Sequence, residues 1–93
     1  MDPKDIRAKL LNFFQNNFFY GESAEEINAD ESLIDKGYID STGIIGLVVF
    51  IEKAFNLTVY DPEIIPENFD TLNKILAYIN KKVDELNSVG IGR

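Results

Sequence analysis

The segment that most constrains the fold of this chain runs from Asp40 to Phe55 and reads DSTGIIGLVVFIEKAF. It begins with an acid and a hydroxyl and then becomes almost continuously apolar. Its apolar residues recur at three- and four-residue spacing, which is typical of a helix packed on most of its circumference. Because Asp40 can accept backbone N–H bonds as an N-cap, we expect the helix to begin at Ser41 and to end near Phe55.

Ser41 is the candidate functional residue of this segment. A hydroxyl on the first turn of a helix faces the positive end of the helix dipole and several unpaired N–H groups, which favour a phosphate ester. The simpler interpretation is that a serine after an aspartate belongs only to the cap.

The composition excludes several kinds of chemistry. The 93 residues are enough for one domain, and they include no Cys and no His. The chain therefore lacks a thiolate nucleophile, a disulfide, the usual base for an activated serine and the commonest zinc ligands. We expect no enzymatic activity and no metal site, and any thiol chemistry must use a thiol from outside the protein.

The sequence predicts a location in the cytoplasm. The chain has no apolar run of about 18 residues that would span a membrane. Its first residues, MDPKDIRAKL, lack the basic-then-apolar order of a secretory signal.

The negative charge of the chain is concentrated in its middle. Residues 22–70 hold 12 acids and 2 bases, within a chain of net charge −7. Such a segment repels phosphate polymers, so we expect no nucleic-acid partner. It attracts basic protein surfaces and accelerates encounter with them. The alternative is that these charges only keep the protein soluble.

Three further helices are expected. Asp2 and Pro3 start a helix over residues 3–18. A short helix over residues 61–65 begins with a second acid–proline pair and is ended by Pro66. Asp70 caps a last helix from Thr71 to about Leu86. The apolar residues that we expect on its core face are Leu72, Ile75, Leu76, Ile79, Val83 and Leu86.

The predicted fold class is all-α, a small four-helix bundle of three long helices and one short helix. Residues 19–39 form a long connection, which we expect to be held to the core by Ile27, Leu33 and Ile34. The bundle covers residues 1–86, and residues 87–93 form a flexible C-terminal tail.

A calcium loop is excluded although residues 35–40 have the glycine–apolar–acid order of one. Placing Gly37 at the invariant glycine puts Lys36 among the ligands and Gly43 where the bidentate glutamate must be.

The residues around Ser41 resemble the acyl carrier protein family. The resemblance covers about residues 5–82. It rests on Gly37-Tyr38-Ile39-Asp40-Ser41, on the apolar positions Ile44, Ile45, Val48 and Ile51 with Glu52 and Phe55, on Leu33-Ile34-Asp35 upstream, and on Leu57, Val59 and Asp70-Thr71-Leu72 downstream.

The resemblance implies a covalent cofactor on Ser41. In that family the matching serine, beside an acid that is Asp40 here, carries 4′-phosphopantetheine taken from coenzyme A. The arm ends in a thiol that holds acyl groups as thioesters, which accounts for a chain without cysteine. The implied partners are a phosphopantetheinyl transferase and acyl-loading and acyl-processing enzymes that have basic docking patches. The carrier itself is expected to be a monomer.

The candidate partner-binding residues are Asp35, Thr42, Ile45, Val49, Glu52, Glu63 and Glu67. For Ile44, Ile45 and Val49 the preferred interpretation is that all three are core residues, and the alternative is an apolar patch for partners. Asp40 adds a further acid to this face.

The sequence also departs from the family. Thr42 stands where the family commonly has Leu, and Gly43 and Gly46 stand where it often has acids. Each glycine costs about 1 kcal/mol relative to Ala inside a helix. We expect either that a backbone or ligand approaches closely there or that the first turns are soft. These departures favour a specialised carrier.

The predicted function is an acyl carrier of a lipid or secondary-metabolite pathway. One alternative is an aminoacyl or peptidyl carrier, including the D-alanyl type. Another is an unmodified helical interaction module that has kept the fold and lost the arm.

Overall fold

The fold is all-helical, as predicted. The computed structural model describes residues 2–19, 21 and 23–91, and these residues contain no strand. The elements are the helices α1 (Pro3–Asn17), α2 (Ser41–Phe55), α3 (Pro66–Phe69) and α4 (Leu72–Ile91), and the 3₁₀ turns η1 (Ala24–Glu26) and η2 (Asp61–Glu63). None of the described helices is both long enough and apolar enough to cross a bilayer.

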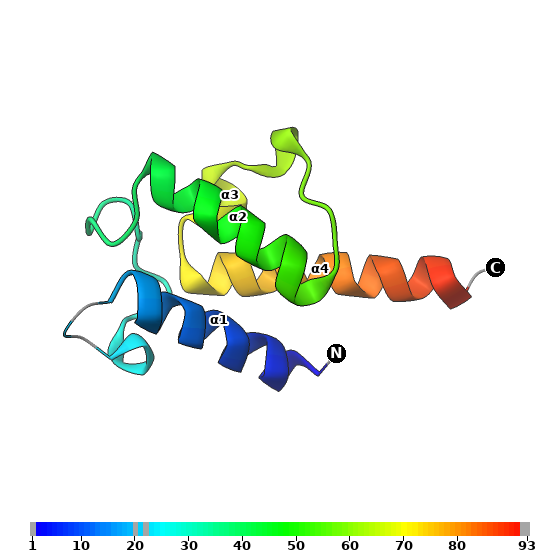
Figure 1. Cartoon of the computed structure of the whole chain (residues 1–93), viewed down its shortest axis with the longest axis horizontal. Coiled ribbons are helices and arrows are strands. Elements are labelled where there is room, and N and C mark those ends of the chain that lie inside the picture. The colour runs from blue at the N-terminus through cyan, green and yellow to red at the C-terminus, as the bar shows by residue number, and fades with distance from the viewer. Residues whose placement is uncertain (1, 20, 22, 92–93) are drawn as a thin grey trace.

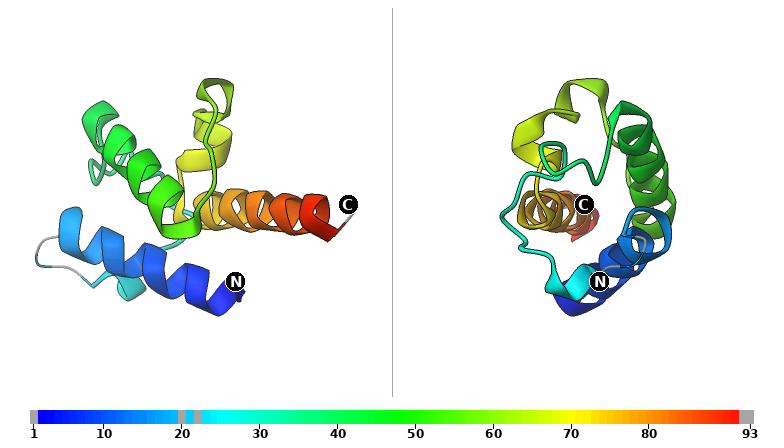
Figure 2. Two further views of the ribbon diagram at one scale, coloured as in Figure 1. Left: turned by 45° about the vertical axis from the view of Figure 1, so that its right-hand side comes forward. Right: turned by 90° about the vertical axis from the view of Figure 1, so that its left-hand side faces the viewer.

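Helix α4 runs along the long axis of the molecule, and α1 and α2 pack beside it (Figures 1 and 2). The rings of Phe13 in α1 and Phe50 in α2 stack with their centroids 4.2 Å apart. The start of α2 lies at the opposite end of the molecule from the start of α1 and the last turns of α4 (Figure 1). Ser41 is therefore presented at one end of the bundle.

Every long helix contributes to one core. Its completely buried side chains are Ile6, Leu10, Phe14, Leu33, Leu47, Ile51, Ile75 and Ile79. The predicted core face of α4 is right for Ile75 and Ile79 and wrong for Leu86, which is 49% exposed. Tyr78, which was not predicted as a core residue, is buried instead, because its ring packs against the core while its hydroxyl reaches a polar partner.

The short α-helix begins at Pro66, five residues after the predicted start at residue 61. Residues 61–63 form only the turn η2, and Pro66 begins α3 instead of ending the preceding helix. The physical reason is that the fixed φ and missing N–H of proline suit the first helical position. The backbone N–H groups of Asn68 and Phe69 then donate to the Ile65 carbonyl.

Both ends of the last helix also differ from the prediction. The Thr71 hydroxyl accepts the N–H of Lys74 at 3.0 Å, so Thr71 and not Asp70 is the cap. Asp70 ends α3 with its N–H bonded to the Pro66 carbonyl. Helix α4 continues to Ile91, beyond the expected end at Leu86. Residues 92 and 93 of the expected tail lie outside the described residues, and the flexibility of 87–93 stays a prediction.

The long connection between α1 and α2 is tied to the end of α1 and to the start of α4. The Gln15 side chain accepts the N–H of Ala24 at 2.7 Å, and the Asn73 N–H donates to the Ala29 carbonyl at 3.0 Å. Leu33 is completely buried and Ile27 packs against the core, as predicted. Ile34 is 48% exposed, so its predicted role as a core anchor is wrong.

Candidate functional site

Asp40 and Ser41 form the start of α2 as the local sequence predicts. Asp40 has an extended backbone, and its Oδ1 accepts the N–H of Gly43 at 2.8 Å. Ser41 is the first helical residue, and its side chain is exposed. The hydroxyl is therefore open to a modifying enzyme and lies at the positive end of a 15-residue helix.

A tight turn in the preceding loop sets the position of Ser41. Gly37 adopts φ +77°, a conformation that residues with a side chain rarely adopt. The turn directs the N–H of Tyr38 back to the Leu33 carbonyl at 2.9 Å, and Ile39 is buried beyond it. Leu33 in turn donates its N–H to the Asp70 carbonyl at 2.7 Å. The loop therefore delivers Ser41 from a point fixed at the α3–α4 junction.

The Ser32–Asp70 contact strengthens this attachment. The Ser32 hydroxyl donates to Asp70 Oδ1 at 2.7 Å and accepts the N–H of Asp35 at 3.1 Å. Asp70, which was predicted as a helix cap, instead receives the loop that carries the functional serine.

The two glycines of α2 have different surroundings. A Cβ on Gly43 would lie 2.7 Å from Ile39 Cγ1 and 3.0 Å from Phe18 Cε1, so the space is needed by two side chains. A Cβ on Gly46 would meet nothing within 4 Å. We expected a backbone or a ligand to approach closely, but at Gly43 the close neighbours are side chains. Packing does not explain Gly46.

An apolar groove of about 340 Å³ opens beside Ser41. Its lining residues come from the loop, α2 and the segment leading into α3, and they are Ile34, Ser41, Ile44, Ile45, Ile64, Ile65, Pro66 and Phe69. None of these lining residues is charged. Ile64 and Ile65 are 36% and 41% exposed, and Phe69 at 2% closes the inner side.

One face of α2 remains uncovered. Thr42, Ile45, Gly46 and Val49 are exposed at the three- and four-residue spacing of a single helix stripe. Ile45 is 66% exposed and Val49 is 44% exposed, so the preferred interpretation of both as core residues is wrong, whereas Ile44 is half-buried.

The predicted partner-binding acids fall into two groups. Asp35, Asp40 and Glu67 are exposed. Glu52 and Glu63 are half-buried and bonded internally, since Glu52 Oε2 accepts the N–H of Val59 at 3.0 Å. The sequence placed all five on one docking face, and the structure gives two of them an internal role that the sequence did not indicate.

Glu63, at the end of η2, is the centre of a polar cluster that joins η2 to α4. Its Oε1 accepts the N–H of Tyr60 at 2.9 Å, the Tyr78 hydroxyl at 3.2 Å and the Lys82 ammonium at 3.0 Å. Burial by itself would raise the pKa of Glu63, but the Tyr60 N–H and the Lys82 charge outweigh burial and the pKa is lowered. Burial, followed by the charge of Glu63, raises the pKa of Tyr78.

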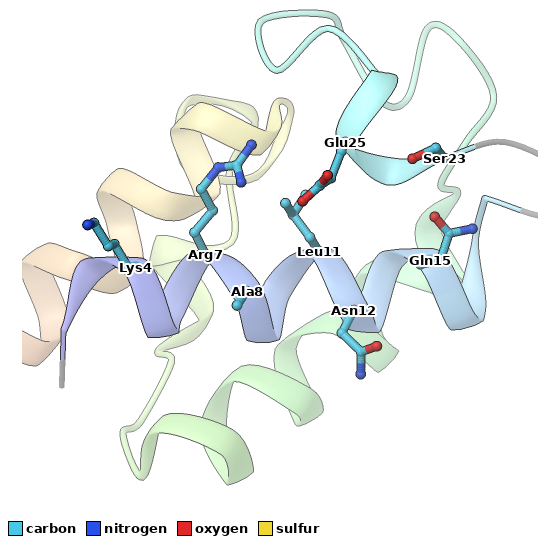
Figure 3. A pocket seen from close by; sticks show the side chains of 8 residues that line it. All are labelled: Lys4, Arg7, Ala8, Leu11, Asn12, Gln15, Ser23 and Glu25. Atoms are coloured by element: carbon cyan, nitrogen blue, oxygen red, sulfur yellow. The ribbon is translucent and has the colours of Figure 1, made fainter.

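A second, larger hollow lies along α1 and contains none of the predicted site residues (Figure 3). It has about 450 Å³ between α1 and η1, with the charged side chains of Lys4, Arg7 and Glu25 on its walls. The groove at Ser41 is the smaller of the two and the one that adjoins the candidate hydroxyl. Among the described residues, no group of three or more carboxylates could hold a metal ion.

The comparisons with known proteins decide the family. No family model matches the sequence. Two D-alanyl carrier proteins, from Streptococcus suis strains 05ZYH33 and 98HAH33, are each 37% identical over 73 residues, which cover 78% of this chain and 89% of theirs. The chain belongs to the D-alanyl carrier protein family. The D-alanyl carrier protein of Streptococcus mutans is 32% identical over 77 residues, 83% of this chain and 94% of its own.

Membership of this family confirms several predictions. It is a family of phosphopantetheine-bearing carrier proteins related to acyl carrier proteins, which is the resemblance that the residues around Ser41 indicated. The cofactor of such carriers is covalent 4′-phosphopantetheine. Carrier proteins act with a phosphopantetheinyl transferase and partner enzymes, and they are not enzymes themselves.

The prediction of the cargo has a different outcome from the prediction of the family. The main interpretation, an acyl carrier for lipid or secondary-metabolite synthesis, is not confirmed. The alternative of a D-alanyl carrier fits the relatives better.

Sequence reasoning missed the residues that shape the groove beside Ser41. Ile64, Ile65 and Tyr78 are the clearest examples. A detectable signal existed for Tyr78, because it precedes the core position Ile79 and has Lys82 one turn further along the same helix.

Proposed function

We propose that this chain carries D-alanine as a thioester on a 4′-phosphopantetheine group attached to Ser41. The observation that carries the proposal is the exposed Ser41 hydroxyl on the first turn of α2, in a chain whose relatives are named D-alanyl carrier proteins. Attachment would form a phosphodiester on Ser41 Oγ, break the pyrophosphate bond of coenzyme A and release adenosine 3′,5′-bisphosphate.

The residues around Ser41 suit such a group. The hydroxyl is accessible, and the helix dipole favours the negative charge of a phosphodiester there. Asp40 is held by the Gly43 N–H and fixes the helix start on which the hydroxyl is presented. When attached, the group supplies the thiol that a chain without cysteine lacks. The transferase must supply the base that removes the Ser41 proton, because the chain has no histidine.

A fatty acyl cargo is the second candidate. The observation that favours it is the groove beside Ser41, whose lining is almost entirely apolar. The names of the relatives favour the smaller and more polar D-alanyl cargo.

Mass spectrometry tests the attachment. We expect wild-type protein, incubated with coenzyme A, magnesium and a broad-specificity transferase, to gain the mass of one phosphopantetheinyl group. Ser41→Ala should gain none, and Thr58→Ala is the matched control because it removes an exposed hydroxyl outside the docking face proposed below. An unmodified wild type, or an adduct that survives in Ser41→Ala, would overturn the proposal. The first outcome would favour the unmodified interaction module instead.

Loading then tests the cargo. We expect the modified protein to accept D-alanine from an ATP-dependent ligase that activates D-alanine, and to be a poor acceptor for an enzyme that activates fatty acids. Preferential loading with a fatty acid would return the proposal to the acyl alternative.

The proposed docking face surrounds Ser41. It consists of the exposed residues Asp35, Asp40, Thr42, Ile45, Val49 and Glu67. We place Glu52 and Glu63 behind it, because their carboxylates already accept internal hydrogen bonds. The carrier works as a cytoplasmic monomer that basic patches on its partners recognise through this face.

A further inference from the structure

Tyr78 connects the floor of the Ser41 groove to its wall. Its ring lies 5.0 Å from the Phe69 ring, measured between centroids, and Phe69 closes the floor. Its hydroxyl donates to Glu63, and the two residues that follow Glu63 in the chain, Ile64 and Ile65, form the wall. A single buried side chain on α4 therefore contacts both the floor residue and the residue that precedes the wall.

Lys82 completes this attachment. Its ammonium lies 3.0 and 3.2 Å from the two carboxylate oxygens of Glu63, and its side chain is only 13% exposed. The same ammonium lies 4.9 Å from the centre of the Tyr60 ring, within the range of a cation–π contact. We name Glu63, Tyr78 and Lys82 the Glu63 clamp.

The segment that carries the wall is also held on either side of the clamp. Before it, Glu52 accepts the N–H of Val59, and both Leu57 and Val59 are buried. After it, the Asn68 amide donates to the Glu63 carbonyl at 2.8 Å. Moving Ile64 and Ile65 outward therefore requires breaking the clamp and leaving the weakly exposed Lys82 without its counter-charge, which is unfavourable.

The side chains behind the groove separate it from the core in the present arrangement. Phe69 is 2% exposed, and Leu47, Ile51 and Ile75 of the same core are completely buried. An alkyl chain tethered near Ser41 can lie over the groove, but it can enter the core only if the wall moves away.

We propose that the Glu63 clamp determines cargo class by holding the groove shallow, so that the carrier presents short cargo in solvent and does not enclose alkyl chains. This inference deepens the proposed function, because it gives a structural reason for a small D-alanyl cargo. Tyr78 and Lys82 are positioning residues, since neither lines the groove itself.

The test tethers a chain to position 41 without the prosthetic group. Because the protein has no cysteine, Ser41→Cys creates a unique thiol at the groove. Octyl methanethiosulfonate forms a disulfide with its thiolate and releases methanesulfinate, and the methyl reagent makes the matched short adduct. Both adducts are compared in proteins with the clamp intact, with Tyr78→Phe, with Lys82→Met, and with the exposed neighbour Lys81→Met as control.

In the Ser41→Cys protein with an intact clamp, and in the Lys81→Met control, we expect octyl and methyl adducts to have Tm values within about 2 °C of each other. In Tyr78→Phe and Lys82→Met, the octyl adduct should melt about 4 °C or more above the methyl adduct, because burial of the chain stabilises the opened state. Nuclear Overhauser contacts between the octyl methyl group and Leu47 should appear only in these two variants.

Octyl contacts to Leu47 with the clamp intact would overturn the proposal, and so would their absence from both clamp variants. Tyr78→Phe removes one hydroxyl and keeps the ring, so it serves if Lys82→Met does not fold. Because no transferase is used, failure of Ser41 to accept phosphopantetheine would refute the proposed function without affecting this result.

Discussion

At the scale of single residues, Gly43 and Gly46 have different surroundings in the same helix. Gly43 leaves space that Ile39 and Phe18 occupy, at 2.7 and 3.0 Å from where a Cβ would lie. Gly46 is exposed and has free space around it. Acyl carriers often have acids at these two positions. Packing explains the glycine at position 43 only.

Alanine substitution should separate the two glycines. We expect Gly46→Ala to raise the free energy of unfolding by about 1 kcal/mol, because alanine is the better helix former. Gly43→Ala gains the same propensity but meets Ile39 and Phe18, and overpacking of this kind costs about 1–3 kcal/mol. Urea denaturation of both variants measures the difference, and a Gly43→Ala protein as stable as Gly46→Ala would contradict the packing argument.

At the scale of elements, the segment between α2 and α3 is held onto α4 by a charged contact. The Tyr60 N–H, the Tyr78 hydroxyl and the Lys82 ammonium all donate to Glu63. Because these contacts lower the pKa of Glu63, its ionised form is stabilised in the folded protein relative to the unfolded chain, whose ordinary value is 4.5. The clamp therefore contributes its full stability above pH 4.5, and the contribution is lost as the pH falls through the lowered pKa.

Acid titration of stability tests this contact. We expect the difference in unfolding free energy between wild type and Glu63→Gln to be largest near pH 7 and to shrink below pH 4.5. Glu67→Gln is the matched control, since Glu67 is exposed. If the difference in unfolding free energy between wild type and Glu63→Gln does not change between pH 7 and pH 3, the ionised clamp adds no stability.

At the scale of the whole molecule, the docking face beside Ser41 is acidic. Its exposed acids are Asp35, Asp40 and Glu67, whereas the bases Lys4, Arg7 and Lys9 lie on α1. The C-terminal half of α4 points away from the start of α2 (Figure 1). This polarity allows a basic partner to be attracted to the end that presents the serine.

Salt dependence measures that attraction. We expect the association rate with the phosphopantetheinyl transferase to fall several-fold as salt rises towards about 0.5 M, because screening shortens the reach of exposed charges. Glu67→Gln should lower the rate at low salt, whereas Asp84→Asn on the distal part of α4 should change it little. Association independent of salt would indicate that the apolar stripe of Ile45 and Val49 dominates docking.

Local sequence alone determined the site helix. Asp40 caps α2, Ser41 begins it and Phe55 ends it, because these boundaries depend on contacts within three or four residues. The residues around Ser41 indicated a thiol-bearing arm through their resemblance to acyl carrier proteins, and such an arm accounts for a chain without cysteine. The all-α class follows from the same local periodicity.

Only the tertiary structure decided which side chains remain available around that helix. Glu63 is bonded to residues 15 and 19 positions further along the chain, and the Ser32–Asp70 bond spans 38 positions. Ile45 has the periodicity of a core residue and is exposed, because no element of the described part of the chain covers that side of α2. Contacts between segments distant in sequence leave no local pattern, so the shallow groove beside Ser41 could be found only in the folded chain.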